Sequence, residues 1–480
     1  MILDHSYANE LPTLGSLVKP EAINNARLSV FNNALAVELG LPSTWSDSEY
    51  LIEKLFGKDT ELNMFSMAQK YGGHQFGSWN PELGDGRGLL LTELVDKNNQ
   101  RWDLHLKGAG PTPYSRFADG RAVLRSTIRE YLASEALHHL GIPTSRALCL
   151  LTSDEPVYRE KQETTAMLIR VCQSHIRFGH FEYFFHSKQL DKLDQLFSYC
   201  FKYHFADCAQ EKEPHLCMLQ KIVKDTAIMV AKWQAYGFNH GVMNTDNMSI
   251  HGITFDFGPY AFLDDFDPGF ICNHSDHSGR YAFDKQPGVA LWNLNALAHA
   301  FTPYLSIEQL KLALAEYEPS LLETYGNMMR QKCGLKKGEP DNQQVVNEWL
   351  DLLAQDKRDY TISFRMLCEF DMHGDNATLR DHFIDREKFS NWAENYKNVL
   401  VKQNMPQEKR QAKMKRQNPN YILRNYLAQL AIDEAEGGHF DKLEALLNVL
   451  QTPFSDTEKY AEYAKPPPKW GKHMEISCSS

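Results

Sequence analysis

The length, composition and charge of the chain exclude some classes of function. It has 480 residues, of which 42% are hydrophobic, and a formal net charge of -11. This length suits about three domains or a two-lobed enzyme with an extension, and the negative balance argues against nucleic-acid binding, which favours a basic face. No apolar run approaches a membrane span, and residues 1–7 lack the order of a signal peptide. We therefore expect a cytoplasmic protein with no nucleic-acid or membrane partner.

The first pattern that indicates chemistry comes after residue 65. Residues 1–65 contain several prolines and a helix-like stretch at 25–41, and we expect this segment to pack on the domain that follows. Residues 71–88 then read YGGHQFGSWNPELGDGRG. Glycines let backbone approach a ligand closely, and successive N–H groups in such a loop bind anions. A glycine-rich turn between strands is the alternative interpretation.

The next segments follow the order expected of a nucleotide-binding lobe. Residues 89–95 and 102–106 are apolar runs separated by a polar turn, which predicts a β-hairpin that ends near Lys107. Residues 121–140 have a helical period and carry Glu130. A kinase-like fold places its phosphate-binding Lys in a strand after a glycine loop. Lys107 and Glu130 are thus candidates for an ion pair, although a single Glu on a helix is usually solvated.

Further strands and a helical region lead to the segment that is richest in chemistry. Residues 149–152 and 164–171 are predicted strands, with Arg170 in the second and Arg177 shortly after it. Two Arg residues near a nucleotide would clamp its phosphates, whereas the alternative is a pair of surface ion-pair partners. Residues 195–238 then have a helical pattern ended by glycine. The scattered cysteines show no C-x-x-C spacing, so we expect most of them to be buried thiols and expect no zinc site.

Residues 240–259 read HGVMNTDNMSIHGITFDFGP and hold Asp246, Asn247 and Asp256. Such oxygen ligands suit Mg²⁺ bound together with nucleotide phosphates. Protein kinases place an Asp base and a metal-binding Asn in one loop and a second metal ligand in Asp-Phe-Gly. If Asn247 is that Asn, Val242 occupies the base position, and the nearest carboxylate is Asp246. The segment therefore indicates either a catalytically inactive relative of the kinases or an enzyme that runs chemistry related to theirs with a different geometry. A third interpretation is an ordinary turn whose side chains hydrogen-bond their own backbone.

Five segments together resemble the selenoprotein O family of protein adenylyltransferases. They are GHQFG, LGDGR, LKGAGPTPYSRFADGRAVLRSTIREYL, HGVMNTDNMSIHGITFDFGP and NPNYILRNYLAQ. The resemblance implies an α+β, bilobal protein-kinase-like fold with a β-rich N-lobe, a helical C-lobe and a helical C-terminal extension. We accordingly expect an N-terminal segment at 1–65, the N-lobe at 66–172, the C-lobe with its catalytic loop and activation-like segment at 173–400, and the extension with a mobile tail at 401–480.

The resemblance also implies an activity. AMP would pass from ATP to Ser, Thr or Tyr hydroxyls of proteins, pyrophosphate would leave, and the nucleotide would bind in the flipped orientation relative to a kinase. Uridylyl transfer from UTP with Mn²⁺ is a second implied activity. Two other classes stay open: a nucleotide-binding pseudokinase without catalysis, which Val242 favours, and a small-molecule phosphotransferase of the aminoglycoside-kinase type, which shares the His-Gly start of the loop.

Individual roles follow from the same resemblance. Asp246 matches the catalytic base, Asn247 and Asp256 match ligands of Mg²⁺ or Mn²⁺, and Glu130 matches the partner of Lys107. One departure is Glu82, where we expect Gln in the family; it places a negative charge near the glycine loop. The matches to nucleotide contacts are Gly84, Gly86, Arg87, Lys107, Asp119, Gly120, Arg170, Arg177 and Asp256.

The resemblance also concerns the last cysteine. Cys478 lies third from the end of the chain, where family members often carry selenocysteine. This suggests redox chemistry, and Cys272 in the activation-like segment is the candidate partner for a regulatory disulfide with Cys478. A chance exposed thiol is the alternative interpretation.

Overall fold

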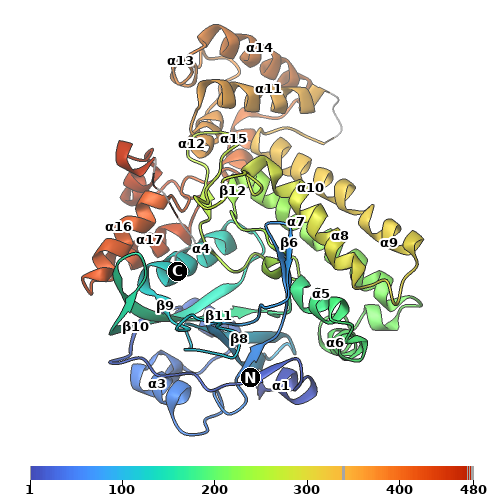
Figure 1. Ribbon diagram of the computed structural model, residues 1–480. Coiled ribbons are helices and arrows are strands. Elements are labelled where there is room, and N and C mark those ends of the chain that lie inside the picture. Colours follow the sequence, from blue (N-terminus) through green and yellow to red (C-terminus); the bar gives the residue numbers. More distant parts are fainter. Residues whose placement is uncertain (1, 338–340, 473, 475, 477–480) are drawn as a thin grey trace.

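The computed structural model describes residues 2–337, 341–472, 474 and 476. One antiparallel sheet has helices on both faces, and a series of helices continues away from it (Figure 1). This arrangement confirms the predicted α+β class. Within the described residues, no helix is both long and apolar enough to cross a membrane.

The sheet has the strand order β2-β4-β7-β8-β11-β10-β3, with β1 beside β7 and β9 beside β11. The predicted hairpin is present, because β7 pairs with β8, and the two strands predicted at 149–152 and 164–171 lie in β10 and β11, which also pair with each other. A separate small hairpin joins β5 and β6. The strands are β1 (Ile2–Asp4), β2 (Gly15–Leu17), β3 (Arg27–Phe31), β4 (Met67–Gln69), β5 (Gly73–Gln75), β6 (Ser78–Asn80), β7 (Gly88–Val95), β8 (Arg101–Lys107), β9 (Ala122–Val123), β10 (Arg146–Tyr158), β11 (Gln162–Cys172), β12 (Phe238–Asn239) and β13 (Ala261–Phe262).

The N-terminal segment is part of this sheet. Strands β1, β2 and β3 pair with β7, β4 and β10. The helix-like interpretation of residues 25–41 is therefore wrong for its first half, which is β3, and right for α2, which follows. The cause is nonlocal: Leu28 and Val30 alternate in the strand and pair with Leu151 and Leu150 of β10.

Two apolar cores lie on opposite faces of the sheet because successive side chains in a strand point to opposite sides. Leu89 and Leu91 pack in the core formed with α2 and α3, whereas Leu90 packs in the core that includes α4. Helix α4 is buried along most of its length because α16 and α17 cover it from the other side. A buried helix next to the sheet can hold a charged residue against the strands only if that residue is paired.

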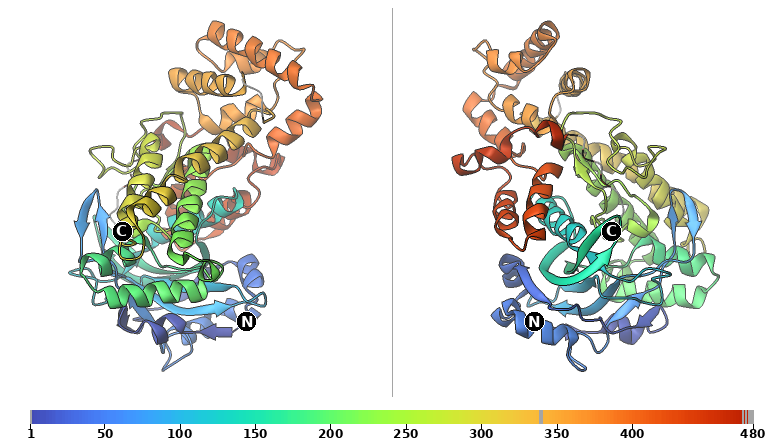
Figure 2. Two further views of the ribbon diagram at one scale, coloured as in Figure 1. Left: turned by 90° about the vertical axis from the view of Figure 1, so that its right-hand side faces the viewer. Right: turned by 60° about the vertical axis from the view of Figure 1, so that its left-hand side comes forward.

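Helices from the middle of the chain extend away from the sheet, whereas α16 and α17 lie back against α4 (Figure 1). Helices α11 to α14, drawn in orange, lie at the end of the molecule away from the sheet (Figures 1 and 2) and share a core with Trp349 and Trp392. The helices are α1 (Ser6–Glu10), α2 (Asn33–Leu39), α3 (Ser48–Phe56), α4 (Leu124–His139), α5 (Phe178–His186), α6 (Leu190–Tyr203), α7 (Pro214–Tyr236), α8 (Gln286–His299), α9 (Ile307–Leu314), α10 (Tyr317–Lys332), α11 (Asp341–Asp356), α12 (Tyr360–Leu367), α13 (Ala377–Asp381), α14 (Arg386–Gln403), α15 (Gln407–Lys415), α16 (Asn425–Glu436) and α17 (Asp441–Leu450).

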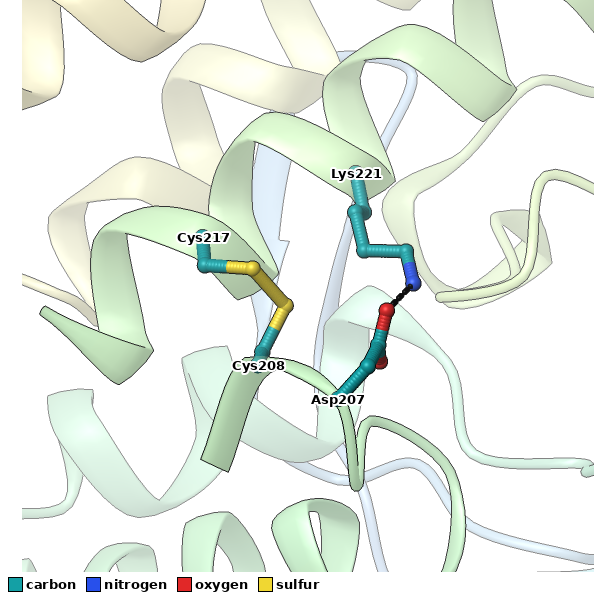
Figure 3. Close-up of a disulfide and its surroundings, with 4 residues drawn as sticks. All are labelled: Asp207, Cys208, Cys217 and Lys221. Carbon is teal, nitrogen blue, oxygen red and sulfur yellow. Dashed lines mark hydrogen bonds and ion pairs between the residues drawn. A yellow bond between two sulfur atoms is a disulfide. The ribbon is translucent and has the colours of Figure 1, made fainter. Parts of the chain in front are cut away.

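The predicted helical region at 195–238 is interrupted between α6 and α7. Cys208 in this connection forms a disulfide with Cys217 in the first turns of α7, and Asp207 forms an ion pair with Lys221 beside it (Figure 3). The disulfide corrects the expectation of thiols for these two cysteines, because their spacing carries no C-x-x-C signal. The buried thiols that match the expectation are Cys149, Cys172, Cys200, Cys333 and Cys368.

Candidate active site

A cavity of about 1050 Å³ brings the predicted nucleotide and metal residues together. Its walls come from the glycine-rich segment before β7, from β8 and β11, and from the loop after α7. Segments more than 150 residues apart in sequence therefore face one space. The predicted residues that line it are Gly84, Gly86, Arg87, Lys107, Asp119, Gly120, Arg170, Arg177, Asp246, Asn247 and Asp256.

A buried ion-pair network lies behind one wall. Lys107 Nζ donates to Glu130 Oε2 (2.8 Å), and Arg170 Nη2 donates to the same oxygen (3.0 Å). Burial lowers the pKa of Lys107 to about 8, although Glu130 opposes this effect. Burial would raise the pKa of Glu130, but Arg170 and Lys107 outweigh it and the pKa is lowered. Glu130 therefore stays ionised and orients two cations at the cavity.

Asp256 is held by two arginines. Its backbone has φ 58°, the left-handed region that is uncommon for a residue with a side chain. Arg170 Nη1 lies 3.1 Å from Asp256 Oδ1, and Arg177 pairs with the other oxygen. Burial alone would raise the pKa of Asp256, but the charges of Arg177 and Arg170 place it well below its usual range. Asp256 is thus a permanent anion that faces the cavity.

Asp246 has the opposite protonation behaviour. It lies in a short 3-10 helix (Thr245–Asn247) and is 7% exposed. Burial raises its pKa to about 7, an effect that the charge of Arg177 opposes. Gln75 Nε2 donates to Asp246 Oδ2 (3.3 Å), whereas Oδ1 has no hydrogen-bond partner among the described residues. This carboxyl can exchange a proton near neutral pH and has one oxygen available to do so.

The loop around Asp246 is held by contacts of its neighbouring residues. Asn247 Nδ2 donates to the carbonyl oxygen of Val242 (3.0 Å), which leaves the carboxamide oxygen as an acceptor. The aliphatic side chain of Val242 lines the same cavity at the position where the sequence comparison with kinases expects a base. Arg177 Nη1 donates to the carbonyl oxygen of Asp246 (2.7 Å) and so fixes this loop.

The loop after β8 approaches the cavity closely. Gly120 has φ 69°, and a Cβ added there would lie 2.1 Å from the carbonyl carbon of Gly110, so the position accepts only glycine. Asp119 beside it accepts a hydrogen bond from Arg159 (2.8 Å). Glu82, the departure from the family pattern, lines the cavity and is exposed.

Some residues at the cavity carry functional groups that the sequence reasoning missed. Asp85 is buried and accepts from the backbone N–H of Gln69 (3.0 Å) and from His105 (3.3 Å). Tyr71 presents its ring to the guanidinium of Arg177 at 4.5 Å. Asp85, Gln75 and Tyr71 all lie in the glycine-rich stretch at 71–88, where only the glycines and Arg87 were considered.

Of the two redox candidates, the structure describes only Cys272. Cys272 is buried, with its thiol 3.6 Å from the carbonyl oxygen of Asn239, and does not line the cavity. Cys478 lies outside the described residues. Near Cys272, the backbone N–H of His274 donates to the carbonyl oxygen of Ile476 (3.1 Å), so the end of the described chain reaches this segment.

Comparisons with known proteins agree with the motifs. The family profile described as protein adenylyltransferase SelO matches residues 3–451. The chain is 65% identical over 480 residues to the protein nucleotidyltransferase YdiU of Pseudoalteromonas atlantica, and the match covers 100% of both chains. It is 50% identical over 477 residues to YdiU of Yersinia pseudotuberculosis, with 99% of both chains covered. The chain therefore belongs to the SelO family of protein adenylyltransferases.

Proposed function

We propose that the protein transfers AMP from ATP to Ser, Thr or Tyr hydroxyls of other proteins and releases pyrophosphate. The observation that carries this proposal is the pair of carboxyls in one cavity with opposite pKa shifts. Asp256 stays anionic, while Asp246 has a pKa of about 7 and an unpartnered oxygen. Nucleotidyl transfer to a hydroxyl needs one anion to hold a cation at the phosphates and one group to accept the hydroxyl proton.

We also propose that the sheet and helices form a protein-kinase-like N-lobe at 66–172 and C-lobe at 173–400, with residues 401–480 as the extension. The ion pair between a Lys at the end of β8 and a Glu on α4 supports this interpretation, because kinases hold their phosphate-binding Lys in this way. The loop with Asn247 and the later Asp256 then corresponds to the metal-binding part of a kinase site.

The residues present fit Mg²⁺. The Asp256 side chain is 21% exposed, and the Asn247 carboxamide oxygen is available as an acceptor. Carboxylate and amide oxygens are the hard donors that Mg²⁺ prefers, and Mn²⁺ accepts the same set. Asp256 and Asn247 would hold the ion, which would supply positive charge to a bound triphosphate. Binding would require Asp256 to share its oxygens with Arg170 and Arg177.

The chain's own residues account for binding and proton transfer. Lys107, Arg170 and Arg177 present fixed positive charge to the phosphates, and the anion of Glu130 keeps the first two in place. The attacking hydroxyl oxygen forms a bond to the α-phosphorus, the bond from that phosphorus to the bridging oxygen breaks, and pyrophosphate leaves. Asp246 accepts the hydroxyl proton as the new bond forms, and its pKa near 7 suits this role.

ATP labelled separately on the α- and γ-phosphates tests the proposal with the full-length protein and a bacterial protein extract as acceptor. Label on protein from the α-position alone supports adenylyl transfer. Label from the γ-position alone would mean kinase activity, and ATP binding without any label would mean a binding module without catalysis. A parallel reaction with α-labelled UTP and Mn²⁺ determines whether uridylyl transfer uses the same site, in which case Asp246→Ala loses both activities.

A further inference from the structure

We propose that His74, Glu182 and His186 form a binding site for a transition metal of the Zn²⁺ class, separate from the nucleotide cavity. His74 lies on β5, and the other two residues lie on α5. One ligand atom from each of the three lies within 4.8 Å of the others. His74 Nδ1 and Glu182 Oε1 are already 2.6 Å apart.

The distances allow a metal after a small adjustment. Zn²⁺ bonds to nitrogen and oxygen at about 2.0–2.2 Å, so tetrahedral ligand atoms lie about 3.3 Å apart. The His74–Glu182 pair is already closer than this, and the imidazole of His186 must approach by about 1.5 Å or less. His186 is exposed at the C-terminal end of α5, and its ring lies beside that of the partly buried Trp79, with the ring centroids 4.5 Å apart.

Glu182 provides an independent indication of a ligand. Its side chain is 0% exposed, and within the described residues Oε2 has no hydrogen-bond partner. A buried carboxylate with one oxygen unpartnered is costly, because burial removes the water that would otherwise solvate it. A divalent cation between Glu182 and the two imidazoles would give this buried carboxylate a positively charged partner.

Space for further coordination lies next to the three ligands. A cavity of about 230 Å³ is lined by His74, His186, Trp292, Asn295, Ala296 and His299. The volume holds several waters, and His299 offers a fourth nitrogen on α8. Three protein ligands with an open position are typical of zinc sites in which water completes the coordination.

The donor set determines which metal fits. Two imidazoles and one carboxylate suit Zn²⁺ and similar transition metals, whereas Mg²⁺ prefers oxygen ligands and retains its waters. The oxygen donors of Asn247 and Asp256 instead favour Mg²⁺. The two sites can therefore be filled independently by choice of metal. The spacing of cysteines could not indicate this site, because its three ligands are two histidines and a glutamate.

A metal here would tether the hairpin β5–β6 to α5. The same hairpin touches the loop that contains Asp246: the backbone N–H of His74 donates to Thr245 Oγ1 (2.7 Å), and Gln75 donates to Asp246. A Cβ added at Gly73 would lie 2.6 Å from Asp246 Oδ1, so the approach is close. The site therefore holds the hairpin over the Asp246 loop, and this structural role does not depend on the reaction catalysed there.

Zinc binding to the full-length protein tests the proposal. The protein is stripped with a chelator, Mg²⁺ in excess fills the oxygen-ligand site, and Zn²⁺ is titrated in competition with a chromophoric chelator. We expect one tightly bound Zn²⁺ ion per chain in the wild type and in Asp256→Ala. In His186→Ala, the affinity for Zn²⁺ should fall by at least about 100-fold. His439→Ala, which removes an exposed histidine on another face of the chain, is the matched control and should bind as the wild type does.

Two further readouts separate a specific site from adventitious binding. Zn²⁺ should raise the Tm of the wild type but not of His186→Ala, and should slow amide hydrogen exchange in residues 73–80. His186 is exposed, so its variant should fold; Glu182→Gln is the second test, and a folded Glu182→Gln protein should also lose the tightly bound Zn²⁺ ion. Unchanged affinity in His186→Ala, loss in Asp256→Ala, or no tightly bound Zn²⁺ ion in the wild type would each overturn the proposal.

Discussion

Replacing Asp246 by asparagine should stabilise the folded protein at alkaline pH. Asp246 has an ordinary pKa of 3.8 in the unfolded chain and a pKa of about 7 in the folded protein because it is buried. Each pKa unit corresponds to about 1.36 kcal/mol. An ionised Asp246 therefore costs the folded state up to about 4 kcal/mol, and asparagine of nearly the same shape removes that cost.

The pH window follows from the direction of the shift. Well below the unfolded pKa of 3.8, at about pH 3 and lower, the carboxyl is protonated in both states and costs nothing. As the pH rises toward 7, the unfolded chain loses the proton first, so the stability of the wild type falls; above 7 the whole cost is present. The stability gain of Asp246→Asn should be about 4 kcal/mol at pH 8, about 2 kcal/mol at pH 5, and nearly absent at about pH 3.

Urea denaturation followed by tryptophan fluorescence at pH 5 and pH 8 measures these differences. Asp256→Asn is the matched control, because the pKa of Asp256 is lowered and the loss of its anion leaves Arg170 and Arg177 without their partner. The same chemical change should then destabilise the protein at pH 8. The burial argument would be refuted if Asp246→Asn were no more stable than the wild type at pH 8. It would also be refuted if the gain in the free energy of unfolding were the same at pH 5 and pH 8.

Asp256→Ala should abolish AMP transfer, because the triphosphate would meet the hydroxyl without its metal; wild-type incorporation of α-label would contradict this. Asp246→Ala should lose most of the rate and keep ATP affinity, and wild-type kcat/KM should rise with pH through about 7; a flat profile would exclude Asp246 as the proton acceptor. Glu130→Gln should weaken ATP binding at least about tenfold by calorimetry, because two cations lose their shared anion; unchanged affinity would argue against that role. Oxidation by glutathione disulfide should link Cys272 to Cys478 and lower transfer, as seen by peptide mapping; a reductant response that persists in Cys478→Ser would rule this out.

Elements with a local pattern could be predicted from the sequence. The apolar runs at 89–95 and 102–106 are β7 and β8, and the helical period at 121–140 is α4, shortened by a few residues at its start. Motifs with fixed spacing also led to the family. Both kinds of signal depend on residues close together in the chain, so no knowledge of the tertiary structure was needed.

The missed features depend on contacts between distant segments. Strand β3 exists because it pairs with β10, which lies more than 100 residues later. Gln75 reaches Asp246 across 171 residues, and His74 reaches Glu182 across 108. Gln side chains are mostly exposed and His side chains are intermediate in burial, so neither composition nor spacing separates Gln75 and His74 from solvated side chains. Only the fold shows that these side chains are partly or fully buried against a charged partner.

Asp246 and Asp256 show why the sequence alone could not assign the roles of two identical side chains. They lie ten residues apart; Asp246 is buried and Asp256 is partly buried, and burial by itself raises a carboxyl pKa. The difference comes from direct ion pairs: the guanidinium groups of Arg177 and Arg170 pair with the side chain of Asp256, whereas Arg177 donates only to the backbone carbonyl of Asp246. The two arginines thereby keep one carboxyl ionised for a cation and leave the other poised to accept a proton near neutral pH.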